Sequence, residues 1–250
     1  MDIHMMELFF EIHSDLPREG PGDSQSTQKA LSLMKDLPDQ PLILDIGCGP
    51  GKQTMDLIEM TKGRIIAIDN HRPYVDRLNK KASKAGLKNR IHAFYGDMTR
   101  PGFKEESFDV IWSEGAIYIM GFENGLKTWK PLLKKKGYIA VTECTWLKPN
   151  PPQEVKRFFD EGYPGMLDIE ANLRVIKGTG YYIADHFTLP EHAWWNDYYH
   201  PLEDRIDRLK EKYKDNEEAL QLLEGEGVEI ELYRKYSDYY GYVFYVIRLC

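Results

Sequence analysis

The segment LILDIGCGPGKQT at residues 42–54 constrains the fold of this chain more than any other. Its first five residues are apolar except for Asp45, a pattern typical of a short, buried parallel strand. Glycines follow at alternate positions, Gly47, Gly49 and Gly51. Such glycines let backbone N–H groups and a helix start approach a ligand closely. We therefore expect a polar or charged ligand here, since a turn without a ligand explains three glycines poorly.

The spacing of these glycines excludes two common phosphate-binding motifs. The dinucleotide fingerprint G-x-G-x-x-G would need its third glycine where Lys52 stands, which disfavours a nicotinamide-dependent reductase. A P-loop would need serine or threonine after Gly51-Lys52, and the chain has Gln53 there. Neither of these two motifs therefore accounts for the glycine segment.

Strands and helices are expected to alternate through the first half of the chain. Two helices, at 5–12 and 26–37, precede the glycine segment. We then expect strands at 42–46, 64–69, 91–95, 108–112 and 138–142, and helices at 54–61, 74–85 and 122–134. Strands separated by crossovers of helix length imply a parallel sheet covered on both faces. The fold class expected is therefore α/β, a doubly wound Rossmann-like sheet.

The pattern changes in the second half, after the turn-rich KPNPPQ at 148–153. Helices are expected at 154–161, 168–176, 191–213 and 216–225, with strands at 181–189 and 242–249. We interpret this half as a helical lid or insertion and expect one antiparallel strand near the C-terminus. The expected organisation is one domain over 1–250, with a helical cap (1–40), a cofactor-binding core (41–146), a lid and acceptor region (147–230) and a final strand (231–250).

Composition excludes several classes of protein. The formal net charge of -7 disfavours extended contact with nucleic acid. The odd number of cysteines, Cys48, Cys144 and Cys250, fits neither a disulfide framework nor a zinc site, and we expect no metal. No stretch reaches the roughly 20 apolar residues that would span a bilayer. We therefore expect a soluble, cytoplasmic enzyme without membrane insertion; the sequence does not indicate its oligomeric state.

Five motifs in order carry a resemblance to a known family. The pattern Asp45-x-Gly47-x-Gly49-x-Gly51 strongly resembles motif I of the class I S-adenosylmethionine-dependent methyltransferases. IIAIDN then places Asp69 at a strand end, where a carboxylate can accept hydrogen bonds from both ribose hydroxyls, although a helix cap is the alternative. FYGDM, FDVIWSEGAIYIMG (motif IV) and KPLLKKKGYIAVTE follow as in that family. The resemblance covers residues 42–143 and is closest in style to the ubiquinone-methylase-like branch, which acts on small molecules.

The resemblance implies S-adenosylmethionine as cofactor and S-adenosylhomocysteine as product. In the family, the residue at Asp97 takes the adenine amino group and the one at Met98 packs on the ring. The cofactor-binding residues expected on this basis are Asp45, Gly47, Cys48, Gly49, Gly51, Gln53, Asp69, Asn70, Gly96, Asp97, Met98, Ser113, Glu114 and Gly115. The N-terminal segment with Phe9, Phe10 and Arg18 is expected to close over the cofactor, although Arg18 fits a charged turn equally.

Methyl transfer from a sulfonium needs mainly positioning and desolvation, with a base only if the acceptor must lose a proton. The candidate catalytic residues are Glu114, Glu143 and His186; surface or structural roles are their alternatives. Tyr118, Trp195, Tyr199 and His200 are candidates for the acceptor site, where aromatic rings suit an apolar or cationic acceptor. Packing of the lid against the sheet is the alternative for these aromatic residues.

The identity of the acceptor stays open, with nitrogen, oxygen, sulfur and carbon nucleophiles all compatible. We expect a small-molecule acceptor, because the Asn-Pro-Pro-Tyr motif typical of nucleic-acid and glutamine methylation is absent after the fourth strand. A protein arginine methyltransferase is one alternative, because Ser113-Glu114 and Glu123 faintly resemble the paired glutamates of that family. A non-catalytic module that binds S-adenosylmethionine is the other.

Overall fold

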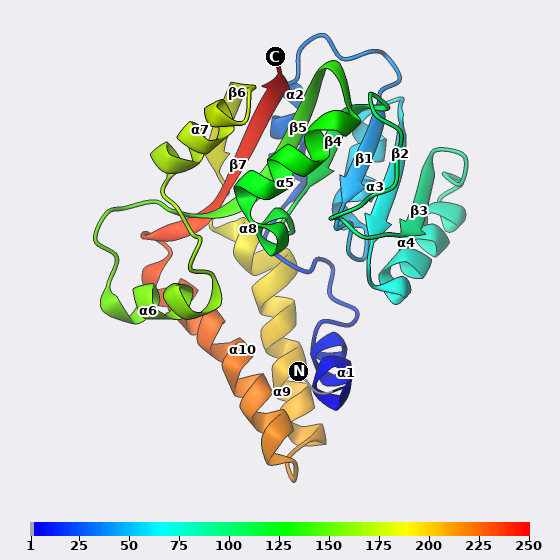
Figure 1. Cartoon of the computed structure of the whole chain (residues 1–250). Coiled ribbons are helices and arrows are strands. Elements are labelled where there is room, and N and C mark those ends of the chain that lie inside the picture. Colours follow the sequence, from blue (N-terminus) through cyan, green and yellow to red (C-terminus); the bar gives the residue numbers. More distant parts are fainter. Residues whose placement is uncertain (1–2) are drawn as a thin grey trace.

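The computed structural model describes residues 3–250, with side chains from residue 7 onward. Seven strands form one sheet in the order β3-β2-β1-β4-β5-β7-β6 (Figure 1). The strands are β1 (Leu42–Ile46), β2 (Arg64–Asp69), β3 (Ile91–Tyr95), β4 (Phe108–Ser113), β5 (Leu133–Trp146), β6 (Tyr181–Thr188) and β7 (Tyr240–Leu249). The first five strands pair in parallel, and β7 is antiparallel to both of its neighbours. The predicted Rossmann-like sheet with one antiparallel strand is confirmed.

Helices cover both faces of this sheet. The helices are α1 (Ile3–Ile12), α2 (Ser24–Ser32), α3 (Lys52–Met60), α4 (Arg72–Lys84), α5 (Phe122–Trp129), α6 (Gln153–Gly162), α7 (Ile169–Gly178), α8 (His192–Trp194), α9 (His200–Lys212) and α10 (Glu217–Tyr236). Three short turns complete the set, η1 (Ile117–Met120), η2 (Lys130–Leu132) and the π-helical η3 (Trp195–Tyr199).

The two faces of β1 belong to two different cores, because successive side chains of a strand point in opposite directions. Ile43 packs in one core with apolar residues of α2, α3 and α4. Leu44 and Ile46 pack in the other with residues of α5 and α7. A strand buried on both faces has to be apolar throughout, which explains the LILDI pattern.

A third core lies outside the sheet, in a layer of helices at the carboxyl ends of the parallel strands (Figure 1). Figure 1 shows α1, α9 and α10 beside one another in this layer. Polar contacts fix α1 there: Lys212 donates to Oε1 of Glu11 at 2.5 Å, and Arg205 donates to the carbonyl oxygen of Glu11 at 2.9 Å. The N-terminal helix is therefore attached to the second half of the chain.

Three helix predictions were wrong at their C-terminal ends, and the first of these helices, expected at 26–37, already ends at Ser32. The helix expected at 122–134 ends at Trp129, because Pro131 lacks the N–H that a longer helix needs, and β5 already begins at Leu133. The helix expected at 216–225 continues through Gly225 and Gly227 to Tyr236. The buried side chains of α10 pack in the third core, and this packing outweighs the low helix propensity of the two glycines. Residues 231–236, expected in the final strand region, are therefore helical.

The helix expected at 191–213 is broken into α8, η3 and α9 by a π-helical turn. The strands expected at 42–46, 64–69 and 91–95 are confirmed at those residues. Over the described residues, no helix is long and apolar enough to cross a membrane.

Candidate functional site

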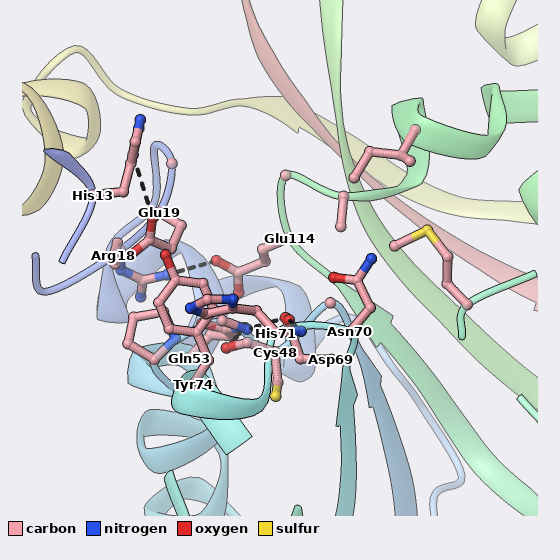
Figure 2. Close-up of a pocket in the computed structure, with 18 of the residues that line it drawn as sticks. His13, Arg18, Glu19, Cys48, Gln53, Asp69, Asn70, His71, Tyr74 and Glu114 are labelled. Carbon is pink, nitrogen blue, oxygen red and sulfur yellow. Dashed lines mark hydrogen bonds and ion pairs between the residues drawn. The ribbon is translucent and has the colours of Figure 1, made fainter. Parts of the chain in front are cut away.

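A pocket of about 540 Å³ lies at the carboxyl ends of β1, β2, β3 and β4, between the sheet and the helical layer. Open α/β sheets bind ligands at this edge, where the strand order reverses on either side of β1. Figure 2 shows side chains from both layers converging here, with His13, Arg18 and Glu19 on one side and Asp69 and Asn70 on the other. The pocket is therefore built by two parts of the chain that are far apart in sequence.

The glycine loop forms the floor of the pocket. Gly47, Gly49 and Gly51 have φ of 72°, 51° and 84°, a region that favours glycine. A Cβ on Gly47 would also lie 2.5 Å from the Cβ of Ala116. The amides of Gly47 and Cys48 donate to the carbonyl oxygen of Ile68, which fixes the loop on the end of β2. The loop is thereby held in a shape that only glycine accommodates.

Asp69 joins this loop to the end of β2. Its Oδ2 accepts from the amide of Gly49 at 2.9 Å, and its Oδ1 accepts from the amide of His71 at 2.8 Å. Burial raises the pKa of Asp69, against the two backbone hydrogen bonds, which lower it. Each carboxylate oxygen keeps a second lone pair for a ligand. Asp69 lines the pocket and is placed to receive two hydroxyl groups.

Asp45 lies behind the loop and does not line the pocket. Its Oδ2 accepts from Oγ1 of Thr54 at 2.5 Å, and burial raises its pKa to about 7. Gln53 donates to the carbonyl oxygen of Cys48 at 3.0 Å. Asp45 therefore supports the loop from below, through the first turn of α3.

The loop after β3 lines the pocket with Gly96, Asp97 and Met98. Both carboxylate oxygens of Asp97 lie 2.8 Å from Oγ1 of Thr99. The hydrogen bond from the amide of Thr99 lowers the pKa of Asp97 and keeps it ionised. The backbone of Met98 is fixed by Nε1 of Trp129, which donates to its carbonyl oxygen at 2.9 Å. A thioether and a hydrogen-bond acceptor therefore flank this end of the pocket.

Glu114, after β4, is held by three donors. Its Oε1 accepts from Nε1 of Trp112 at 2.8 Å and from Oγ1 of Thr27 at 3.0 Å, and its Oε2 accepts from Nη1 of Arg18 at 2.8 Å (Figure 2). Arg18 also donates to Asp56 at 3.2 Å. A carboxylate bound this completely is an anchor for the N-terminal segment, and its lone pairs are poorly available to act as a base.

His13 follows α1 and lies between two carboxylates. Its Nδ1 is 3.3 Å from Oε2 of Glu19, and its Nε2 is 3.5 Å from Oε2 of Glu226 on α10. Burial alone would lower the pKa of His13, but the two glutamates raise it to about 9. His13 is therefore an imidazolium at neutral pH, and it links the N-terminal segment to α10 across the pocket.

Aromatic rings of α1 also line the pocket. Phe10 stacks on His71 at 3.7 Å between ring centroids, and Phe9 lies 4.5 Å from His13. These rings place α1 over the end of β2, as expected for the N-terminal segment. Among the residues that the structure describes, no group of three or more His, Cys, Asp or Glu side chains could hold a metal ion.

Comparison with known proteins shows which families this chain resembles. A family model described as a methyltransferase domain matches residues 43–137. The chain also matches the sterol 24-C-methyltransferase of Aspergillus fumigatus, with 24% identity over 170 residues that are 64% of this chain and 45% of the relative. Residues 43–137 of this chain are therefore similar to a methyltransferase domain. It spans about half the length of the curated relatives it matches.

Two solved structures share the class I fold over almost the whole chain. A methyltransferase of Thiobacillus denitrificans has a TM-score of 0.83 at 19% identity and covers 100% of both chains. One of Geobacter sulfurreducens has a TM-score of 0.81 at 19% identity and covers 96% of this chain and 97% of its own. Both were solved with S-adenosylhomocysteine. At this identity the likeness establishes the fold.

Most of the cofactor residues expected of a class I methyltransferase line the pocket. Gly47, Cys48, Gly49, Gln53, Asp69, Asn70, Gly96, Asp97, Met98, Glu114 and Gly115 do so, whereas Asp45, Gly51 and Ser113 do not. The last three are still needed for its shape: Asp45 supports the loop, Gly51 precedes α3, and Ser113 is buried at the end of β4.

The other predicted site residues are dispersed. Tyr118 lines the pocket. Glu143 does not, and its Oε1 accepts from the hydroxyl of Tyr163 at 2.5 Å. His186 lies on the edge strand β6 and stacks on Tyr245.

The aromatic cluster expected at the acceptor site packs behind the pocket. Trp195 and His200 contact each other at 5.2 Å and do not line the pocket. Tyr199 is buried, and its hydroxyl donates to Oε1 of Glu229 at 2.9 Å. Glu123, named for the arginine-methyltransferase alternative, pairs with Lys127 on the surface of α5.

Several pocket residues were missed from sequence, namely His13, Glu19, Tyr74, Glu226 and Glu229. One signal was present for the last two, since glutamates three residues apart lie on one face of a helix. It was missed because the helix was expected to end at residue 225.

Proposed function

We propose that this chain transfers a methyl group from S-adenosylmethionine to a small-molecule acceptor. The observation that carries the proposal is the hydrogen bond between Asp69 and Gly49, which sets a carboxylate and the glycine loop at one edge of the pocket. A carboxylate there suits the ribose hydroxyls of an adenosine, and Asp97 with Met98 suits its adenine. S-adenosylmethionine supplies an activated methyl group on its sulfonium.

The residues of this chain contribute orientation and exclusion of water. Asp69 and the loop amides fix the nucleoside end, while α1 and its rings cover the pocket. Covering the site strengthens the electrostatic interactions inside it and holds the two reactants in line. Since the transfer is a displacement at carbon, positioning supplies most of the rate enhancement that such a site can give.

A small acceptor is supported by the dimensions of the pocket and by the relatives. The volume of about 540 Å³ has to hold both cofactor and acceptor, which leaves little room for a macromolecular segment. The curated relatives are named as sterol methyltransferases, which are enzymes of small molecules.

The cofactor assignment is tested by calorimetric titration of S-adenosylmethionine and S-adenosylhomocysteine, with NADH as the control ligand. Both should bind to the wild-type chain and bind at least about tenfold more weakly to Asp69→Ala, since a hydrogen bond to a charged group contributes about 1.5–3 kcal/mol. Binding of NADH instead, or of none of the three, would refute the proposal. A chain that binds both ligands but never releases S-adenosylhomocysteine in an acceptor screen would be the non-catalytic module.

We also propose a cytoplasmic location. The three cysteines are free thiols, two of them buried, which fits a reducing compartment. Fractionation of source cells tests this, and recovery of the protein with membranes or in a secreted fraction would contradict it.

A further inference from the structure

The pocket has a second wall that the cofactor residues do not form. Tyr118 follows β4, Tyr198 lies in η3, and Glu226 and Glu229 lie on α10, and all four line the pocket. Tyr118 and Tyr198 line the same pocket as Glu229, and after burial its charge is the largest influence that raises the pKa of each phenol.

The charges along the pocket are strongly unbalanced. Carboxylates line it at six positions, Glu19, Asp69, Asp97, Glu114, Glu226 and Glu229, and the cationic groups are His13 and Arg18. Arg18 forms ion pairs with Glu114 and Asp56. His13 is shared by Glu19 and Glu226.

Glu229 has no ion-pair partner among the described residues. Its Oε1 accepts a hydrogen bond from the neutral hydroxyl of Tyr199 at 2.9 Å. Burial raises the pKa of Glu229, and it outweighs the hydrogen bond from Tyr199 and the charge of His13, which both lower this pKa. Among the described residues, no ion pair therefore balances a negative charge on Glu229.

His13, which also lines the pocket, does not share this lack of a partner. Its Nδ1 lies 3.3 Å from Glu19 and its Nε2 lies 3.5 Å from Glu226, so its charge is already paired. The wall thus offers one carboxylate, that of Glu229, for a cation.

We infer that the methyl acceptor is a small amine, bound as its ammonium form beside Glu229 on the side of the pocket lined by Tyr118 and Tyr198. This rests on the function proposed above. A carboxylate and aromatic rings complement an ammonium group, and the interaction is strong where water is excluded. An anionic acceptor would meet the carboxylates of Glu226 and Glu229 and no unpaired basic group among the described pocket residues.

The chemistry balances with the groups present. The bound ammonium passes one proton to the carboxylate of Glu229, which frees the nitrogen lone pair. The nitrogen then forms a bond to the methyl carbon, the carbon–sulfur bond breaks, and its electron pair returns to sulfur. The products are a methylated ammonium and S-adenosylhomocysteine, and the proton leaves Glu229 for solvent on release.

The test uses the whole chain and two sets of matched probes that differ in charge. One set is ethanolamine, ethylene glycol and glycolate, and the other is benzylamine, benzyl alcohol and benzoate. Each is titrated calorimetrically into the protein saturated with S-adenosylhomocysteine. In at least one set the amine should bind about tenfold or more tightly than both matched partners. Equal or tighter binding of the alcohol or carboxylate, or no binding by any probe, would overturn the inference while leaving the cofactor assignment intact.

A variant pair locates the effect. Glu229→Gln keeps an oxygen for the hydroxyl of Tyr199 but removes the charge, and should weaken amine binding about tenfold. Glu224→Gln makes the same change on an exposed part of α10 outside this pocket and should leave it unchanged. Both variants should bind S-adenosylhomocysteine as the wild type does. Amine affinity unchanged in Glu229→Gln would refute the role of Glu229, and failure of the wild type to bind S-adenosylhomocysteine would refute the proposed function itself.

Discussion

Arg18 donates from Nη1 to Oε2 of Glu114 at 2.8 Å, joining the segment after α1 to the end of β4. Both side chains are almost fully buried, with 3% and 4% exposure. The pair lies at the edge of the pocket and gives the N-terminal segment a fixed position over the glycine loop. This buried ion pair therefore connects two walls of the pocket through residues 96 positions apart in sequence.

Arg18→Ala should destabilise the protein by about 3–5 kcal/mol, because it leaves the buried carboxylate of Glu114 without its cation. Urea unfolding measures this. The matched control is Arg77→Ala, which removes a partly exposed arginine 3.8 Å from the exposed Asp15 and should cost about 1 kcal/mol or less. The double variant Arg18→Ala with Glu114→Gln should recover part of the loss. Equal losses for the two arginines would contradict this account.

Gly47→Ala should be far more damaging than Gly86→Ala. Both glycines have φ of 72°, so each alanine adopts an unfavourable backbone conformation that costs about 1–2 kcal/mol. At Gly47 the new Cβ would also lie 2.5 Å from Ala116, whereas at Gly86 nothing lies within 4 Å. Thermal unfolding and S-adenosylhomocysteine titration of both variants measure the difference. Equal losses of stability and of ligand affinity in the two variants would show that the glycine loop can shift to accommodate the new Cβ.

The stability contributed by His13 should depend on pH. Its folded pKa of about 9 lies above the ordinary value of 6.5, so the contribution is complete below about pH 6.5 and is lost as the pH rises through about 9. His13→Gln should therefore cost up to about 3 kcal/mol at pH 6 and much less at pH 10. His92→Gln, on an exposed position of β3, is the control and should show no such trend. A pH-independent loss in His13→Gln would exclude the ion pairs with Glu19 and Glu226 as its cause.

Asp45→Asn should stabilise the fold at alkaline pH. Burial raises the pKa of Asp45 to about 7, and the nearby charges of Glu114 and Asp69 act in the same direction. Because the folded pKa exceeds the unfolded one, the wild type loses stability as the pH rises from about 4 through 7. Asparagine does not ionise. The free energy of unfolding of the variant, measured with urea, should therefore rise relative to that of the wild type between pH 5.5 and pH 8.5. Exposed Asp39 provides the control, Asp39→Asn, and a gain of the same size there would count against burial as the cause.

The sequence alone determined the parallel sheet and the cofactor edge. Strand periodicity, glycine spacing and the carboxylates at strand ends are local properties, and the structure places β1, β2 and β3 at the predicted residues. Parallel strands bring their carboxyl ends to one edge of the sheet. The residues that follow β1 to β4 therefore lie near one another. Asp69 could be named for this reason, whereas Asp97 was named from the resemblance to the methyltransferase family.

Only the tertiary structure decided which distant side chains complete the pocket. His13, Glu226 and Glu229 reach it because α1 and α10 pack together in the helical layer, and α10 continues past two glycines only because its buried face is packed there. Glu143 and His186 satisfied the same local criteria as true pocket residues, yet they point elsewhere. Local propensity encodes each element, whereas the side chains that face a cavity are selected by long-range packing, which leaves no periodic signal in one sequence.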